Sequence, residues 1–166
     1  MPRKLLLLDR DGTLMEDVGY PNDPAAVRLL PGAAAAVRAF ADAGFLPAVV
    51  SNQSGLARGR ISPQEAQAVH ERFVALFAEA SGLELPCYYC PHGPDDDCDC
   101  RKPKPGMLLA AARDLDGTPA VMVGDKPSDV AAGRAAGAFT IWLGHTYPPG
   151  EPPPDRIIPH WHGFAV

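Results

Sequence analysis

The sequence predicts an α/β fold in which one parallel β-sheet carries helices on both faces. Short apolar runs alternate along the chain with longer helical segments, and most of the apolar runs end in a polar or glycine-containing turn. Strands that are separated by helices are joined by right-handed crossovers, which produce parallel pairing. At 166 residues the chain has the length of one domain with a sizeable core.

Five strands are expected, each from a short apolar run that is bounded by turn residues. The first contains four successive leucines, a pattern typical of a parallel strand buried on both faces. The second begins after Gly44 and ends before Ser51. The expected strands span residues 5–8, 45–50, 85–89, 120–123 and 139–143.

Four helices are expected between these strands, at residues 32–43, 62–80, 106–115 and 127–136. The first follows Pro31 and is rich in alanine. The second has the clearest beginning, because Ser62, Pro63 and Glu65 form an N-cap, a first-turn proline and a capping box. His70 falls on this helix and is expected at its surface.

We expect residues 1–146 to form the folded domain and the proline-rich residues 147–166 to form a tail that extends along its surface. The segment 15–30, between the first strand and the first helix, is too short for a separate cap domain. The site at the strand ends should therefore be open to solvent.

Composition excludes several classes of protein. A hydrophobic content of 46% disfavours disorder, and a net charge of −5 disfavours a nucleic-acid partner. No apolar run approaches the roughly 20 residues of a membrane span, and the N-terminal leucine run is too short for a signal peptide. We therefore expect a cytoplasmic protein without a membrane partner, and a monomer because no large apolar surface segment is visible.

Polar side chains stand at the predicted carboxyl ends of three strands, where open α/β sheets bind ligands. The residues are Asp9 and Asp11, Ser51 and Asn52, and Asp125 with Asp129 nearby, and a further loop carries Arg101 and Lys102. Carboxylates can hold a hard divalent cation, whereas Lys and Arg neutralise phosphoryl oxygens. Taken alone, Asp11 and Gly12 could simply form a polar strand-to-helix turn. The convergence of all these groups instead favours a catalytic site.

Three cysteines and a histidine form the second pattern: Cys90, His92, Cys98 and Cys100. Three thiolates and one imidazole suit a closed, tetrahedral, structural zinc site. A disulfide is the alternative, which a cytoplasmic setting disfavours. Cys87 is expected to be a small buried residue on a strand. Zinc would order the proline- and aspartate-rich loop and thereby set the direction of the residues that follow the last ligand.

These motifs together resemble the haloacid dehalogenase superfamily of phosphatases. The resemblance lies in Asp9-Arg10-Asp11-Gly12-Thr13, Ser51-Asn52, Arg101-Lys102 and Gly124-Asp125 with Asp129. The longer motifs, 51–59 and 98–103, are more specifically similar to the D-glycero-D-manno-heptose 1,7-bisphosphate 7-phosphatase family. The resemblance covers residues 5 to about 143 and implies a Rossmann-like haloacid dehalogenase fold.

The resemblance implies that Asp9 is a nucleophile forming an aspartyl phosphate and that Asp11 is the general acid and base. It implies Mg²⁺ held by an Asp9 oxygen, the Asp11 carbonyl and Asp125. Ser51 and Asn52 would hold the phosphoryl group, and Lys102 would neutralise it. The implied contacts to a sugar bisphosphate substrate are Asp17, Val18, Gly19, Tyr20, Ser51, Asn52, Gln53, Ser54, Arg101, Lys102 and Lys126.

Two other functions remain open from the sequence. The loop between Cys90-Pro91-His92 and Cys98-Asp99-Cys100 is short, which looks closer to histidinol-phosphate phosphatases. The motifs Ala57-Arg58-Gly59 and Gly19-Tyr20 instead favour the heptose family. A non-catalytic, zinc-stabilised binding module is the alternative of another class. The complete set of Asp9, Asp11, Lys102 and Asp125 argues against it.

Overall fold

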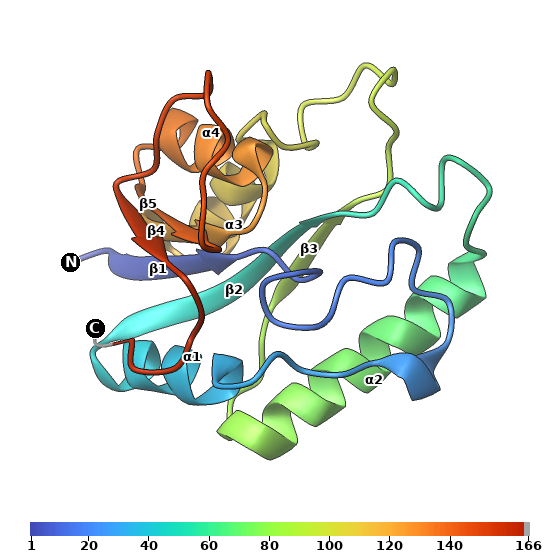
Figure 1. Ribbon diagram of the computed structural model, residues 1–166, viewed down its shortest axis with the longest axis horizontal. Coiled ribbons are helices and arrows are strands. Elements are labelled where there is room, and N and C mark those ends of the chain that lie inside the picture. The colour runs from blue at the N-terminus through green and yellow to red at the C-terminus, as the bar shows by residue number, and fades with distance from the viewer. Residues whose placement is uncertain (165–166) are drawn as a thin grey trace.

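The computed structural model describes residues 1–164 as a single β-sheet between two layers of helices (Figure 1). The strands are β1 (Arg3–Leu8), β2 (Phe45–Asn52), β3 (Cys87–Cys90), β4 (Gly117–Gly124), β5 (Phe139–Leu143) and β6 (Arg156–Ile158). The helices are α1 (Ala33–Asp42), α2 (Pro63–Ser81), α3 (Gly106–Asp114) and α4 (Pro127–Ala135), with a 3₁₀-helix, η1, at Pro24–Ala26. The predicted doubly wound fold is confirmed.

The four leucines of β1 divide the hydrophobic core into two halves. Because successive side chains of a strand point to opposite faces, Leu6 and Leu8 pack with buried residues of α1 and α2, whereas Leu5 and Leu7 pack with those of α3 and α4. Figure 1 shows these helix pairs on opposite sides of the sheet. All four leucines are fully buried, as the sequence predicts.

The strand order determines where a ligand can bind. The order is β3-β2-β1-β4-β5-β6, and every neighbouring pair is parallel. After β3 the chain crosses back over the sheet and adds β4 on the other side of β1. The direction of winding therefore reverses between β1 and β4, which opens a crevice at their carboxyl ends.

The predicted beginning of α2 is confirmed in detail. Ser62 accepts a hydrogen bond from the Glu65 backbone nitrogen at 3.1 Å, and the Glu65 carboxylate accepts one from the Ser62 nitrogen at 2.8 Å. This reciprocal pair satisfies backbone donors that have no partner within the helix.

The C-terminal tail is more than a surface segment, which corrects the sequence prediction. Residues 156–158 form β6 and pair with β5 in parallel. Trp161 is only 3% exposed, and its indole nitrogen donates to the Thr13 carbonyl at 2.6 Å. The sequence did not predict this strand, because three residues between prolines carry no detectable periodicity. Residues 165–166 of the predicted tail lie outside the described residues.

Within the described part of the chain, none of the helices combines the length and the apolar character that a membrane span requires.

We expect Trp161→Ala to lower the free energy of unfolding by about 3–5 kcal/mol, because it removes a large buried side chain. Trp161→Phe keeps a smaller ring in the core and loses the donor to Thr13, at a lower expected cost of about 1–3 kcal/mol. Urea unfolding of both variants measures the difference. Equal stability of Trp161→Ala and the wild type would show that the tail does not contribute to the cooperative fold.

Candidate active site

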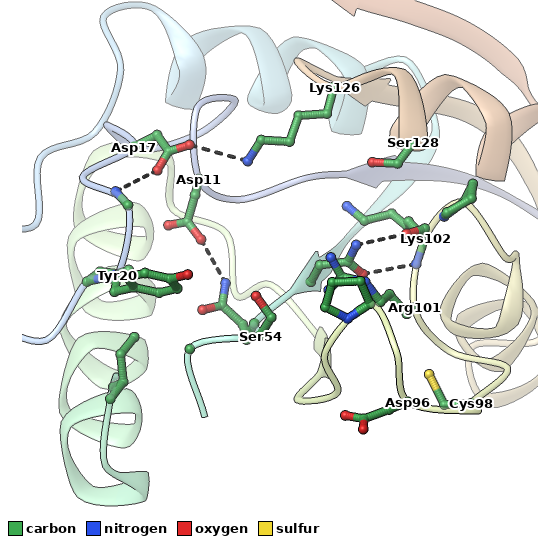
Figure 2. A pocket seen from close by; sticks show the side chains of 18 of the residues that line it. Asp11, Asp17, Tyr20, Ser54, Asp96, Cys98, Arg101, Lys102, Lys126 and Ser128 are labelled. Carbon is green, nitrogen blue, oxygen red and sulfur yellow. Dashed lines mark hydrogen bonds and ion pairs between the residues drawn. The ribbon is translucent and has the colours of Figure 1, made fainter. Parts of the chain in front are cut away.

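The predicted site residues converge at the crevice between β1 and β4. Asp9 and Asp11 follow β1, Ser51 and Asn52 end β2, and Asp125 follows β4. Lys102 arrives from the loop between β3 and α3. Figure 2 shows how the side chains around this crevice face one another.

Lys102 is the central cation of the site and is 1% exposed. Its Nζ atom lies 2.9 Å from Asp9 Oδ1 and 2.6 Å from Asp129 Oδ1, and it donates to the Val50 carbonyl at 2.7 Å. Burial alone would lower the pKa of Lys102, but the carboxylates of Asp129 and Asp9 raise it above its ordinary value. The ammonium group therefore stays charged beside Asp9.

Three carboxylates crowd this cation. Oxygens of Asp9, Asp125 and Asp129 lie within 4.8 Å of one another. Burial, followed by repulsion from Asp9 and Asp129, raises the pKa of Asp125 to about 8. Asp129 is raised less, to a pKa of about 6, by burial and by Asp9 against the opposing effect of Lys102. One ammonium group cannot balance three ionised carboxylates, and the raised pKa of Asp125 reflects that excess of negative charge. A divalent cation held by Asp9 and Asp125 would offset it.

Asp129 is a site residue that the predicted ligand and contact set omits. Its Oδ1 pairs with Lys102, and its Oδ2 accepts a hydrogen bond from the Lys126 backbone nitrogen at 3.0 Å, at the start of α4. Both oxygens are engaged, so Asp129 holds Lys102 rather than offering a free ligand. The spacing Gly124-Asp125-x-x-x-Asp129 is the sequence signal that points to it.

Gly12 permits the close approach of β1 and β4 at this point. Its φ of +83° is in the left-handed region, and a Cβ atom there would overlap the Asp125 carboxylate. No other residue type could turn the chain after Asp11 and leave room for Asp125.

Asp11 is held by two partners. Gln53 donates to its Oδ2 at 2.7 Å, and Arg10 approaches both of its oxygens at 3.3 Å. Burial raises the pKa of Asp11, with Arg10 and Gln53 opposing, and the net direction is upward. A raised pKa suits a carboxyl group that must donate a proton near neutral pH. Arg10, 2% exposed, was not predicted as a site residue.

Asn52 makes contacts other than the predicted one. Its Oδ1 accepts from the Lys102 backbone nitrogen, and its Nδ2 donates to the Lys102 carbonyl, both at 3.0 Å. Its carboxamide therefore fixes the backbone of Lys102, whereas the sequence predicted a contact to the phosphoryl group. Ser51, 1% exposed, accepts a hydrogen bond from Gln53 at 2.8 Å.

A cavity of about 750 Å³ lies in front of these groups. Ten of the predicted catalytic and substrate-contact residues line it: Asp11, Asp17, Gly19, Tyr20, Asn52, Gln53, Ser54, Arg101, Lys102 and Lys126. The predicted zinc ligand Cys98 lines it too. Val18 does not; it is half-exposed and faces a smaller hollow with Met15 and Pro21. Asp9 and Ser51 are buried and do not belong to the lining.

The outer part of the cavity carries cations on two sides. Lys126 pairs with Asp17 at 3.3 Å, and this ion pair joins the segment after β1 to the beginning of α4 (Figure 2). Arg101 donates to the His92 carbonyl at 3.2 Å and is thereby tied to the cysteine-rich loop. Arg101 is partly exposed and Lys126 is exposed, whereas Lys102 is buried, so the two outer cations can meet a second anionic group of a ligand.

The cysteine-rich loop gathers the four predicted zinc ligands. One side-chain atom from each of Cys90, His92, Cys98 and Cys100 lies within 4.8 Å of the others. The Cys90 and Cys100 sulfurs are 3.0 Å apart, and His92 Nδ1 lies 3.2 Å from the Cys100 sulfur. Cys87 stands outside this group and contacts the Leu85 carbonyl. All four cysteines are unbridged, and the cluster has the donors of a tetrahedral zinc site.

Comparison with known proteins agrees with this geometry. A family model of haloacid dehalogenase-like hydrolases matches residues 16–137, which lie beyond the Asp9 and Asp11 motif. D-glycero-β-D-manno-heptose-1,7-bisphosphate 7-phosphatase of Pseudomonas putida is 44% identical over 145 residues, which are 83% of this chain and 81% of that protein. The enzyme of the same name from Haemophilus ducreyi is 42% identical, over 88% of this chain and 85% of its own.

A solved structure extends the similarity to three dimensions. The D,D-heptose 1,7-bisphosphate phosphatase of B. bronchiseptica, complexed with magnesium and phosphate, is 32% identical with a TM-score of 0.83. The match covers 95% of this chain and 93% of that one. The family model, the relatives and the arrangement of Asp9, Lys102 and Asp125 agree: the chain belongs to the haloacid dehalogenase-like hydrolases and is a phosphatase.

Proposed function

We propose that the protein removes the 7-phosphate from D-glycero-D-manno-heptose 1,7-bisphosphate through a phosphorylated Asp9. The observation that carries the chemistry is the buried ion pair between Lys102 and Asp9, at the base of an open cavity that contains further cations. The heptose substrate is supported by the names of the relatives, which are 44% and 42% identical.

In the first step an Asp9 oxygen attacks phosphorus, and the bond from phosphorus to the sugar oxygen breaks. Lys102, fixed 2.9 Å from Asp9 Oδ1, offsets the charge of the transferring group. Asp11 gives its proton to the departing oxygen. In the second step Asp11 takes a proton from water, which attacks the aspartyl phosphate and releases inorganic phosphate and free Asp9.

Asp9, Asp125 and the Asp11 carbonyl would hold a magnesium ion beside this group. Bound there, the ion would neutralise phosphoryl oxygens and the excess carboxylate charge that raises the pKa of Asp125. Magnesium in the B. bronchiseptica relative supports this assignment. Hard oxygen ligands and several retained waters make such an ion exchangeable.

The two ends of a sugar bisphosphate match the two cationic regions of the cavity. The phosphate to be cleaved meets Lys102, and the distal one meets Arg101 and Lys126 on the rim. The remaining lining residues that we assign to the sugar are Asp17, Gly19, Tyr20, Gln53 and Ser54. These rim cations provide local positive charge on a chain whose net charge is −5.

Zinc bound by Cys90, His92, Cys98 and Cys100 would order the loop that delivers Arg101 and Lys102. The His92 carbonyl already accepts a hydrogen bond from Arg101, so loss of the metal would release that side chain. Unbridged cysteines favour a reducing compartment, and we therefore place the enzyme in the cytoplasm.

Substrate choice is tested by phosphate release from both anomers of the heptose bisphosphate, histidinol phosphate and short sugar phosphates. We expect the highest kcat/KM with a heptose bisphosphate, since only a bisphosphate engages Lys102 and the rim cations together. A higher kcat/KM with histidinol phosphate would overturn the heptose assignment and leave the phosphatase chemistry intact.

We expect Asp9→Asn to reduce turnover by several orders of magnitude, because a carboxamide cannot form the acyl phosphate. The fold should survive, since Lys102 keeps its ion pair with Asp129 at 2.6 Å. Steady-state kinetics and thermal unfolding measure the two effects. Asp42→Asn, on the surface of α1, is the matched control and should behave as wild type. Substantial activity in pure Asp9→Asn protein would contradict the nucleophile.

Magnesium and zinc should respond differently to a chelator. Mild EDTA should abolish turnover, and Mg²⁺ alone should restore it, because the closed thiolate site retains zinc far more tightly. Cys98→Ser should lower zinc content and impair selection of the bisphosphate, while Cys87→Ser, outside the cluster, should leave both unchanged. Metal analysis and kinetics provide the measurements. Absence of zinc from native protein, or full zinc content in Cys98→Ser, would refute the zinc site.

A further inference from the structure

Arg10 lies between the two catalytic aspartates in the sequence but turns away from the cavity into the core. Its guanidinium lies 5.2 Å from the centre of the Tyr89 ring and 6.0 Å from that of Phe73. A guanidinium that is 2% exposed is costly unless all its donors are used. The hydrogen-bond partners of the Arg10 guanidinium therefore indicate its role.

One edge of the guanidinium faces the carboxylate of Asp11. Nε approaches Oδ1 and one terminal nitrogen approaches Oδ2, both at 3.3 Å. Such a two-point contact fixes the rotation of a carboxylate as well as its position, which a single hydrogen bond cannot do. Gln53 adds a third donor to Asp11, at 2.7 Å.

The other terminal nitrogen of Arg10 is fixed by a chain of two aromatic residues. It donates to the Tyr89 hydroxyl at 3.4 Å, and that oxygen lies 2.8 Å from His70 Nδ1. Burial, together with the charge of Arg10, lowers the pKa of His70, so a neutral ring can accept the Tyr89 proton. His70 is half-buried against Tyr89, which corrects its predicted place on the helix surface.

We propose that Arg10, Tyr89 and His70 are positioning residues that orient the Asp11 carboxyl group for proton transfer to the leaving oxygen. Arg10 connects Asp11 to β3 through Tyr89 and to α2 through Phe73, and the Tyr89 hydroxyl in turn meets His70 of α2. None of the three aromatic side chains lines the cavity. This inference rests on the proposed acid role of Asp11.

The leaving group distinguishes this role from a general structural one. A sugar alkoxide must be protonated as it departs, whereas p-nitrophenolate departs readily without a proton. Disorientation of Asp11 should therefore lower kcat/KM for an alkyl phosphate and spare p-nitrophenyl phosphate. A loosened fold would lower both. The alkyl probe is the best alkyl phosphate of the substrate panel described above, whichever compound that is.

Tyr89→Phe removes one hydroxyl and keeps the ring that covers Arg10. We expect kcat/KM for the alkyl phosphate to fall by about tenfold and that for p-nitrophenyl phosphate to change by less than about twofold, since misplacement of a catalytic group is costly only where it acts. Tyr88→Phe is the matched control, because Tyr88 packs on the opposite core and should show neither effect. Equal losses with both substrates, or no loss, would overturn the proposal.

Arg10→Lys gives a second, independent measurement, because it keeps the buried charge and removes the two-point contact. The selective fall in kcat/KM for the alkyl phosphate should be larger in Arg10→Lys than in Tyr89→Phe. In an Asp11→Asn background Arg10→Lys should cause no further selective fall, because the effects of two substitutions that act through the same group are not additive. Additive losses would contradict action through Asp11. If Asp11→Asn loses activity selectively on the alkyl phosphate but Arg10→Lys and Tyr89→Phe do not, the positioning role is overturned and the acid role of Asp11 stands. If Asp11→Asn loses activity equally on both substrates, the acid role itself is overturned.

Discussion

The buried ammonium group of Lys102 is the interaction on which the site depends. It joins Asp9 after β1, the Val50 carbonyl in β2 and Asp129 in α4, so one side chain connects three elements that are distant in the sequence. Removing one partner from a buried ion pair costs about 3–5 kcal/mol, because the other charge is left uncompensated. The same contacts that hold the crevice together therefore place a permanent cation beside the nucleophile.

Lys102 does not come from a strand or helix, so its position has to be set by its surroundings. The Asn52 carboxamide holds both polar atoms of its backbone, and Cys100 of the metal-ligand cluster lies two residues before it. A loop rich in proline and aspartate has few apolar contacts with which to order itself. Zinc is our proposed replacement for those contacts, which explains why a metal without a chemical role would sit so near the reaction.

The two faces of the sheet support different parts of the chemistry. On the side of α4, Asp129 and Lys102 set the charge around the nucleophile Asp9. On the side of α2, Arg10 and Tyr89 reach Asp11, for which we propose the proton-transfer role. Asp9 and Asp11 are two residues apart, yet different cores fix their surroundings. Two carboxyl groups can then have different roles because their environments differ.

The sequence by itself determined the features that local pattern encodes. Four leucines defined the central strand, Ser62 and Glu65 defined the start of α2, and the order of the polar strand ends indicated the crevice. The cysteines and His92 are close in the chain, so their spacing was sufficient to group them. Each element and the cysteine group is encoded in a short stretch of chain, where periodicity, capping and ligand spacing act, and the crevice follows from comparing the ends of several such stretches.

Only the tertiary structure decided which polar side chains form hydrogen bonds within the protein and with which partners. Asn52 fixes the Lys102 backbone, Arg10 pairs with Asp11 and Tyr89, and Trp161 donates to Thr13 from the far end of the chain. These partners, apart from Arg10 and Asp11, are separated by 50 residues or more. Their contacts arise because burial forces each polar group to find a partner, and which partner is available depends on how the strands and helices pack.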